Sequence, residues 1–304
     1  MMKRYFVRLA AVAVVGLAPT LASAAVITDN FADGALDDST GGINWYAING
    51  FVGNDDSDPA NIKPRLRIED DAGLMGGNAV AVEARGSNSE LMGVIGQPFA
   101  LGSAIGDKVV LSFDFRIEGS NLGGDLRFGL YEDTDNEFGQ GGWGESDGDF
   151  DNNNPGVRGD TGFYLRVPLQ PNGDSARIND EGNVNNILGG SGDADFIARP
   201  DAGQFTGIND NLKHTLTFTV ERTGPGDNDL EMLLELDNQS FGGSDGTNTI
   251  PSALTYDYFV IMTTSDTDWR MDNFQLRSVP EPSSLFLMAC AAPMARRRTR
   301  RLIP

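Results

Sequence analysis

The sequence predicts an all-β protein, built as an antiparallel two-sheet sandwich, on three observations. Apolar and polar residues alternate over many short segments, which is the period of a strand with one buried face. Glycine supplies 38 of the 304 residues, as expected where tight turns join many strands. Beyond the N-terminal segment, no stretch of a dozen residues keeps the period of an amphipathic helix.

The clearest strands come from strict alternation. Apolar side chains occupy every second position at 109–117, 126–130, 163–167 and 216–220. We expect each of these strands to have one face in a core and the other in water. The segment 230–237 follows 214–222 after the turn sequence TGPGDND, so these two strands should form a hairpin. Shorter strand candidates lie at 25–31, 44–51, 65–70, 79–84, 91–97, 256–264 and 269–278.

The last strand carries two further signals. Its apolar phase slips between Met271 and Phe274, which predicts a β-bulge at Asp272-Asn273. The triplet Asp-Asn-Phe recurs at 29–31, so we expect the first and last strands to lie side by side. Trp45 and Trp269 fall in strands and are predicted to be core residues.

The N-terminus has the organisation of a secretory signal. Three positive charges precede an apolar run over 9–21, and Ala22-Ser23-Ala24 offers small residues for cleavage after Ala24. A membrane anchor is the alternative, but the run is shorter than the ~20 residues that span a bilayer. We therefore divide the chain into a signal peptide at 1–24, a single β-sandwich domain at 25–278 and a C-terminal segment at 279–304.

Charge and cysteine content limit the function. Of 23 basic and 44 acidic residues, the segments 1–24 and 280–304 hold eight basic and one acidic, which leaves 15 basic against 43 acidic, a net charge of −28. Such a body repels nucleic acid and anionic lipid and attracts cations. The one cysteine, Cys290, lies in the C-terminal segment, so the body cannot be held by disulfides.

An acidic segment at 132–160 is the candidate metal site. Within it Asp147, Asp149 and Asp151 alternate and Asn153 follows, so that their oxygens could converge on one calcium ion. The pattern departs from an EF-hand loop, because Asn152 stands at the glycine position and Arg158 at the glutamate position. The alternative is a solvated acidic loop that keeps the protein soluble.

Two aromatic residues are the candidate sugar contacts. Trp143 stands between glycines in the same segment, where its ring could form a flat platform for a sugar or fold back against the sheet. Tyr164, in the strand at 161–167, is the second candidate.

The order of these strand patterns resembles the concanavalin A-like or laminin G-like jelly-roll domains of exported bacterial proteins. The resemblance covers nearly the whole body, from ITDNF at 27–31 to WRMDNFQL at 269–276. It implies a jelly-roll sandwich, with short helical targeting segments at both ends, whose concave sheet face and adjoining loops bind sugars and calcium.

Enzymatic alternatives are weaker. Jelly-roll glucanases that resemble this fold carry two catalytic glutamates on a strand, and the nearest string here is Asp133, Asp135 and Glu137, with an aspartate first. Ser244 lies in a Gly-x-Ser-x-Gly string but no helical pattern follows it, and His214, the single histidine, is predicted to be structural. Whether the protein is an enzyme stays open, and we favour a non-catalytic one.

The C-terminal segment resembles the PEP-CTERM sorting signal of Gram-negative bacteria, also catalogued as an ice-binding-protein C-terminal domain. Pro280, Glu281 and Pro282 precede an apolar run of 11 residues, 285–295, and Arg296, Arg297 and Arg298 follow it. The resemblance implies a membrane-bound exosortase as processing partner and transient membrane contact through the tail. An uncleaved anchor is the alternative.

Together these features predict an exported protein of the cell envelope surface or extracellular matrix of a Gram-negative-type bacterium. Its expected role is non-catalytic, with exopolysaccharide as the partner and no nucleic acid bound. A calcium-assisted lectin-like module and a divergent jelly-roll glycoside hydrolase are the alternatives.

Overall fold

The computed structural model describes residues 24–36, 42–48, 64–84, 90–118, 124–134, 160–169, 176–181, 188, 194–201, 203–208, 210–245, 252–264 and 267–281. Within these ranges the chain forms strands and one short 3-10 turn, η1 (Ala72–Leu74). No helix in these ranges is long and apolar enough to cross a membrane. The signal-peptide prediction for 1–24 lies almost wholly outside them.

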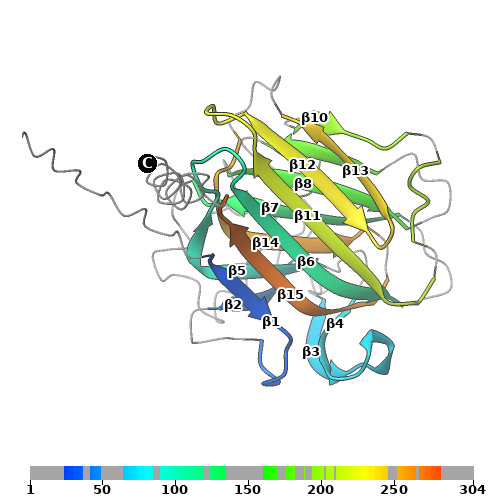
Figure 1. The fold of residues 1–304 in the computed structure, drawn as a ribbon. Helices are drawn as coiled ribbons and strands as arrows, with labels where there is room; N and C mark the ends of the chain where they lie inside the picture. Colours follow the sequence, from blue (N-terminus) through cyan, green and yellow to red (C-terminus); the bar gives the residue numbers. More distant parts are fainter. Residues whose placement is uncertain are drawn as a thin grey trace, which may run out of the picture.

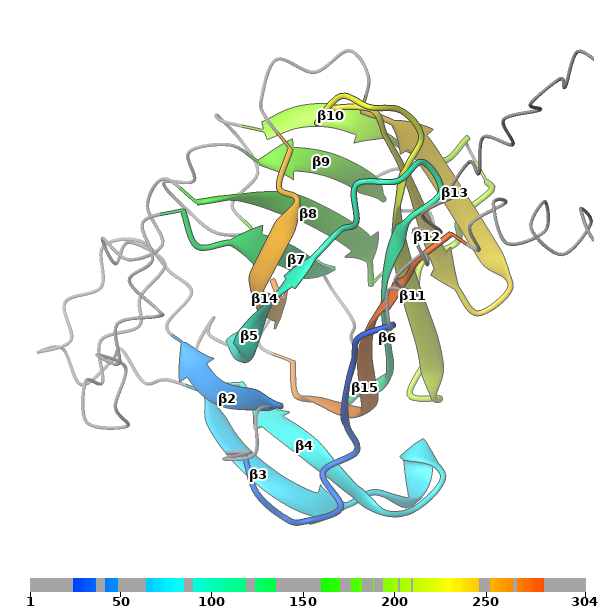
Figure 2. The same cartoon turned by 60° about the vertical axis from the view of Figure 1, so that its left-hand side comes forward.

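Two antiparallel sheets pack face to face, which confirms the predicted jelly-roll sandwich (Figures 1 and 2). Sheet A has eight strands, and its order is β13 (Gln239–Ser244), β12 (Leu230–Leu236), β11 (His214–Arg222), β6 (Lys108–Ile117), β15 (Trp269–Val279), β4 (Asn78–Glu83) and β3 (Arg65–Asp70), with β1 (Val26–Asp29) also paired to β15. Sheet B has seven, in the order β10 (Ala194–Ala198), β9 (Arg177–Glu181), β8 (Thr161–Pro168), β7 (Asp125–Glu132), β14 (Thr255–Thr263), β5 (Glu90–Ala100) and β2 (Ile43–Ile48).

Aromatic rings from both sheets fill the space between them. Phe113 of sheet A lies 5.9 Å from the ring of Phe128 and 5.6 Å from that of Phe259, both in sheet B. Trp45 and Trp269 are 4% and 0% exposed, so their assignment to the core is confirmed. Because the body has no cysteine, this apolar core, worth roughly 25 cal/mol per Å² of buried apolar surface, is the main source of its stability.

The predicted closure of the sandwich is also confirmed. β1 pairs with β15, and Asp29 lies opposite Phe274. The register between β15 and β6 shifts between Asp272 and Gln275, at the predicted bulge, where Asn273 takes a left-handed φ of 52°. The predicted hairpin is β11 and β12, paired from Leu216↔Leu236 to Arg222↔Leu230.

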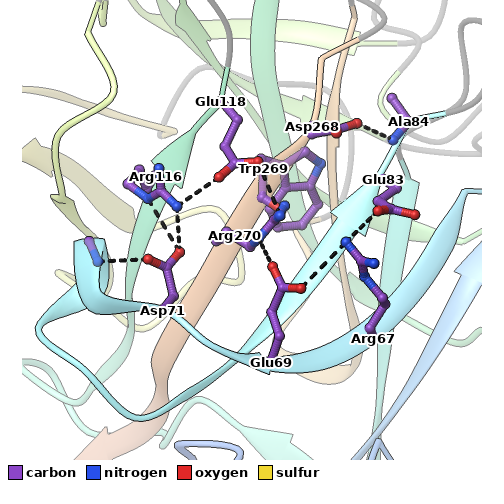
Figure 3. Close-up of polar contacts among 11 residues, drawn as sticks. Arg67, Glu69, Asp71, Glu83, Ala84, Arg116, Glu118, Asp268, Trp269 and Arg270 are labelled. Carbon is purple, nitrogen blue, oxygen red and sulfur yellow. Dashed lines mark hydrogen bonds and ion pairs between the residues drawn. The ribbon is translucent and has the colours of Figure 1, made fainter.

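On the outer face of sheet A, a chain of ion pairs links the edge strand β3 and η1 to β15 and β6 (Figure 3). Each of three guanidiniums contacts two carboxylates: Arg67 contacts Glu83 and Glu69, Arg270 contacts Glu69 and Glu118, and Arg116 contacts Glu118 and Asp71. The Asp71 carboxylate also accepts a hydrogen bond from the Gly73 N–H at 2.7 Å, which caps η1. Burial opposes ionisation of Asp71, but the bonds from Arg116 and Gly73 outweigh it and lower its pKa.

One expectation about the strands was wrong. We predicted that β7 and β8 have one face in water, yet Tyr131 and Tyr164, on the faces directed away from the core, are both 0% exposed. They belong to a second apolar cluster with Met92, Leu188 and Tyr258. The outer face of sheet B is therefore buried at its tyrosines, whereas the side chains of Arg127 and Arg166 on the same face are 21% and 26% exposed.

Candidate functional site

The outer face of sheet B is defined by strand register, because directly paired residues of antiparallel strands point to the same side. One row joins Met262, Arg127, Arg166 and Arg177 across β14, β7, β8 and β9. The next row joins Met92, Val260, Gly129, Tyr164 and Asn179. A third row joins Val94, Tyr258, Tyr131, Gly162 and Glu181.

Two stacked tyrosines form the centre of this face. The rings of Tyr131 and Tyr258 lie 5.2 Å apart and 15° from parallel. The ring of Tyr131 lies over two glycines, since a Cβ on Gly129 or on Gly162 would overlap it. Glycine at both positions therefore lets a large ring lie flat on the sheet.

Hydrogen bonds fix both tyrosine hydroxyls. Tyr131 donates to Glu181 Oε2 at 2.7 Å, and Tyr258 donates to Asp160 Oδ2 at 2.7 Å. Burial, and then the neighbouring carboxylate, raises the pKa of each tyrosine well above its ordinary value. Both hydroxyls therefore stay protonated and act as hydrogen-bond donors rather than as bases.

Arginines flank Tyr164 on either neighbouring strand. The guanidinium carbons of Arg127 and Arg177 lie 5.9 Å and 5.4 Å from the centre of its ring, within cation–π range. Burial raises the pKa of the Tyr164 hydroxyl, an effect that the two arginines partly offset. The structure thus places this predicted sugar contact in the middle of the face, beside cations.

Leu188 covers part of the same face. Its N–H donates to the Tyr131 hydroxyl at 3.3 Å, and its carbonyl accepts from Arg127 Nη1 at 2.8 Å. The residue has a left-handed φ of 58° and is 0% exposed. Both the tyrosine stack and one arginine are therefore held by a backbone group that lies over the sheet.

Glu90 is the most unusual charge-bearing group of the face. It begins β5 in the same alternating phase as Met92 and Val94, and it is 0% exposed. Neither of its carboxyl oxygens has a hydrogen-bond partner among the described residues. Burial raises its pKa to about 8, although the charge of Arg127 acts in the opposite direction, so the group is protonated at neutral pH.

Other buried polar atoms on this face also lack partners. Within the part of the chain that the structure describes, the Nε atoms of Arg127 and Arg166 and the Nδ2 atom of Asn179 make no hydrogen bond. Buried polar groups are nearly always paired, and each unpaired one costs about 1–3 kcal/mol. The Nε atom of Arg67 on sheet A is also unpaired among the described residues, but its guanidinium contacts two carboxylates.

Most of the other predicted site residues lie outside the part of the chain that the structure describes. Trp143 and the calcium candidates Asp147, Asp149, Asp151 and Asn153 lie outside the described residues, so both predictions stay open. Among the residues that the structure does describe, no group of three or more metal-ligating side chains could hold an ion. Of the sorting signal, Pro280 and Glu281 are described, and the Glu281 N–H donates to Asp107 Oδ1 at 3.0 Å, whereas Pro282, Arg296, Arg297 and Arg298 are outside.

The residues considered for catalysis do not assemble a site in the described ranges. His214 begins β11, and its ring nitrogens lie 2.8 Å from Asp237 Oδ2 and 2.9 Å from Asp210 Oδ1, so two carboxylates hold the ring in place. Ser244 is the last residue of β13. Asp133 donates its N–H to Asp257, while Asp135 and Glu137 lie outside the described residues.

The carboxyl groups of the outer face are also poorly placed for glycoside hydrolysis. Glu90 and Glu181 are on β5 and β9, four strand spacings or roughly 19 Å apart, against the roughly 5–9.5 Å that paired catalytic carboxylates need. Both oxygens of Asp160 accept bonds inside the protein, one from Tyr258 and one from the Thr134 N–H.

No family model and no curated sequence match this chain. Among solved structures it is similar to the carbohydrate esterase vb_24B_21 of the Shiga toxin-encoding bacteriophage phi24B, at 13% identity and a TM-score of 0.44, over 83% of this chain and 96% of the other. It is similar to the cellulose-induced protein Cip1 at 12% identity and 0.44, over 82% and 96%. It is also similar to the metal-free Emp46p carbohydrate recognition domain at 16% identity and 0.39, over 76% and 95%.

At such low identities and TM-scores these likenesses identify no activity and no ligand, and the fold assignment rests on the strand order and pairing given above. The chain is thus defined as an antiparallel jelly-roll sandwich with a polar and aromatic site on one sheet. The resemblance of its tail to a sorting signal remains a prediction.

Proposed function

We propose that this chain is an exported, non-catalytic carbohydrate-binding protein that meets polysaccharide at the cell surface or in the extracellular matrix, through the outer face of sheet B. The observation that carries the proposal is a set of buried polar atoms, on Glu90, Arg127, Arg166 and Asn179, that have no partner among the described residues and lie around a cluster of tyrosines. A polyhydroxylated ligand offers donors and acceptors for such atoms, while its apolar ring faces pack on aromatic side chains.

Asn179→Ala tests the proposal. The Asn179 Nδ2 group makes no hydrogen bond to the described residues, so we expect the melting temperature to stay within about 3 °C of wild type while glycan affinity falls about tenfold or more. The measurement is a glycan array with the purified full chain, followed by titration calorimetry on the best ligand. Gln275→Ala, which removes an amide from β15 of sheet A, is the matched control and should bind as wild type does. Reducing-sugar release from the same glycans, or binding unaffected by Asn179→Ala, would contradict the proposal.

The same proposal includes a calcium ion that assists carbohydrate binding. Asp147, Asp149, Asp151 and Asn153 would hold the ion through oxygen ligands, which suit calcium. Repeating the array with calcium and with chelator decides whether the lectin-like alternative applies.

The delivery route is the second part of the proposal. Residues 1–24 direct export, and the Pro280-Glu281-Pro282 segment with its arginines directs sorting by an exosortase-type membrane enzyme. Its support is that the two ends attach side by side: the Ala25 N–H donates to Ser278 Oγ at 3.0 Å, and the Ser278 N–H donates to the Ala25 carbonyl at 2.9 Å. Signals at both ends can therefore engage one membrane without threading the body.

Deleting residues 280–304 should release the protein from the cell envelope into the medium, because the arginines that would hold the tail on the cytoplasmic side are then gone. Immunoblots of envelope and medium fractions measure this release. The mass of the mature wild-type protein distinguishes a cleaved tail, ending near Pro282, from an uncleaved anchor. Unchanged retention of the deletion variant in the envelope would count against both.

A further inference from the structure

One row of the outer face of sheet B carries three arginines in a protein that is otherwise strongly acidic. Arg127 lies directly opposite Arg166, and Arg166 directly opposite Arg177, so three arginines form one row across β7, β8 and β9. Like charges directly opposite each other destabilise a sheet. The three arginines therefore need negative charge close to them, even in a body of net charge −28.

Among the described residues, one carboxylate lies against two arginines of the row. Asp125 pairs with Arg166 at 2.6 Å and approaches Arg127 at 3.8 Å, so one carboxylate serves two guanidiniums. Arg127 uses Nη1 to bind the neutral carbonyl of Leu188, and the Nε atoms of Arg127 and Arg166 have no hydrogen-bond partner among the described residues. Arg127 and Arg166, whose side chains are 21% and 26% exposed, thus offer cationic donors in a partly buried place, where charge-assisted bonds are strong.

We propose that the arginine row binds the carboxylate groups of an acidic polysaccharide, so that the ligand is a uronic-acid-containing glycan. This inference rests on the proposed function, whose binding face it shares. The planar guanidinium fork matches a carboxylate in a bidentate geometry. Neighbouring strands lie about 4.8 Å apart, so a linear polymer laid across them passes the guanidiniums one after another.

Two neighbouring groups fit the same ligand. Glu90 precedes Leu91, which pairs with Ile261, so it lies in the arginine row beside Met262. In its protonated form it adds no negative charge to the row. Asn179, one row further and diagonal to Arg166, offers an Nδ2 donor that has no partner among the described residues. Nucleic acid and anionic membranes are disfavoured, because they present charge over areas much wider than this row to a body that repels them.

Matched ligands test the inference. Size-defined oligomers of galacturonate, mannuronate, guluronate and glucuronate are titrated into the purified full chain, each beside its carboxyl-reduced, neutral counterpart. We expect at least one uronate to bind ten times or more tighter than its reduced form, with an affinity that falls as salt rises. A sulfated galactan is included and should bind more weakly than the best uronate.

Variants connect the result to the row. Arg166→Gln should lower affinity for the uronate at least tenfold and leave affinity for the reduced oligomer unchanged, and Arg166→Lys, which keeps the charge but loses the fork, should be intermediate. Arg277→Gln removes an exposed arginine from sheet A and should bind as wild type does. Melting curves show that each variant is folded.

The outcomes separate the two proposals. Equal affinity for reduced and acidic oligomers, tighter binding of the sulfated galactan, or a folded Arg166→Gln with wild-type uronate affinity would overturn the uronate assignment and leave carbohydrate binding in place. Failure of every glycan, neutral or acidic, to bind would overturn both.

Discussion

Glu90→Gln should make the protein less sensitive to rising pH than the wild type. In the folded protein burial raises the Glu90 pKa from 4.5 to about 8, whereas the unfolded chain keeps the ordinary value. The folded state therefore holds a proton that the unfolded state releases between these values. The stabilisation is fully present below pH 4.5 and is lost as pH rises through about 8, at roughly 1.4 kcal/mol per pH unit.

The measurement is urea unfolding of both proteins at pH 5, 6.5 and 8. Between the first and the last, wild type should lose on the order of 4 kcal/mol relative to Glu90→Gln, because glutamine keeps the shape of the neutral acid without titrating. Glu231→Gln, at an exposed position of β12, is the control and should follow the wild-type pH profile. Parallel profiles for wild type and Glu90→Gln would mean that Glu90 is not buried as the structure places it.

Among substitutions that add one methyl group to the outer face of sheet B, Gly162→Ala should destabilise the protein most. An added Cβ would overlap the Leu130 carbonyl of the neighbouring strand and the Tyr131 ring. The carbonyl belongs to a strand pair and cannot swing away as a side-chain end can. We therefore expect a loss of about 3 kcal/mol in unfolding free energy, together with displacement of the tyrosine stack.

Chemical denaturation measures the stability, and near-UV circular dichroism reports the tyrosine environment. Thr161→Ala, the adjacent position of β8, is the control and should lose less than about 1 kcal/mol with an unchanged tyrosine signal. A Gly162→Ala protein with wild-type stability and spectrum would contradict the placement of Tyr131 flat over the sheet.

The fold could be predicted because the core strands are regular. The alternating residues of 109–117 and 216–220 all point into the core, and the phase slip in the last strand marks a real bulge. β9, β10 and β13 were not predicted. The polar residues of β9 are almost fully buried: Asn179, Asp180 and Glu181 are 3%, 0% and 3% exposed, and only tertiary packing makes that burial possible.

The site was predicted only through Tyr164. Reading the strands by alternation assigned Tyr164 and Arg166 to water, because polar positions opposite an apolar phase normally face solvent. The sequence did contain a signal: Gly129 and Gly162 interrupt two strands where an aromatic ring lies close to the backbone. The arginine row could not be read from the sequence, since it depends on the register of β7, β8 and β9.

The central claim is that polysaccharide binds to the outer face of sheet B, and a crystal structure with a bound tetrasaccharide tests it. The sugar should lie across β7, β8 and β9, within hydrogen-bonding distance of Arg166 and Asn179 and in contact with the tyrosine cluster. A sugar bound on the outer face of sheet A, or at the strand ends without contact to these residues, would contradict the claim.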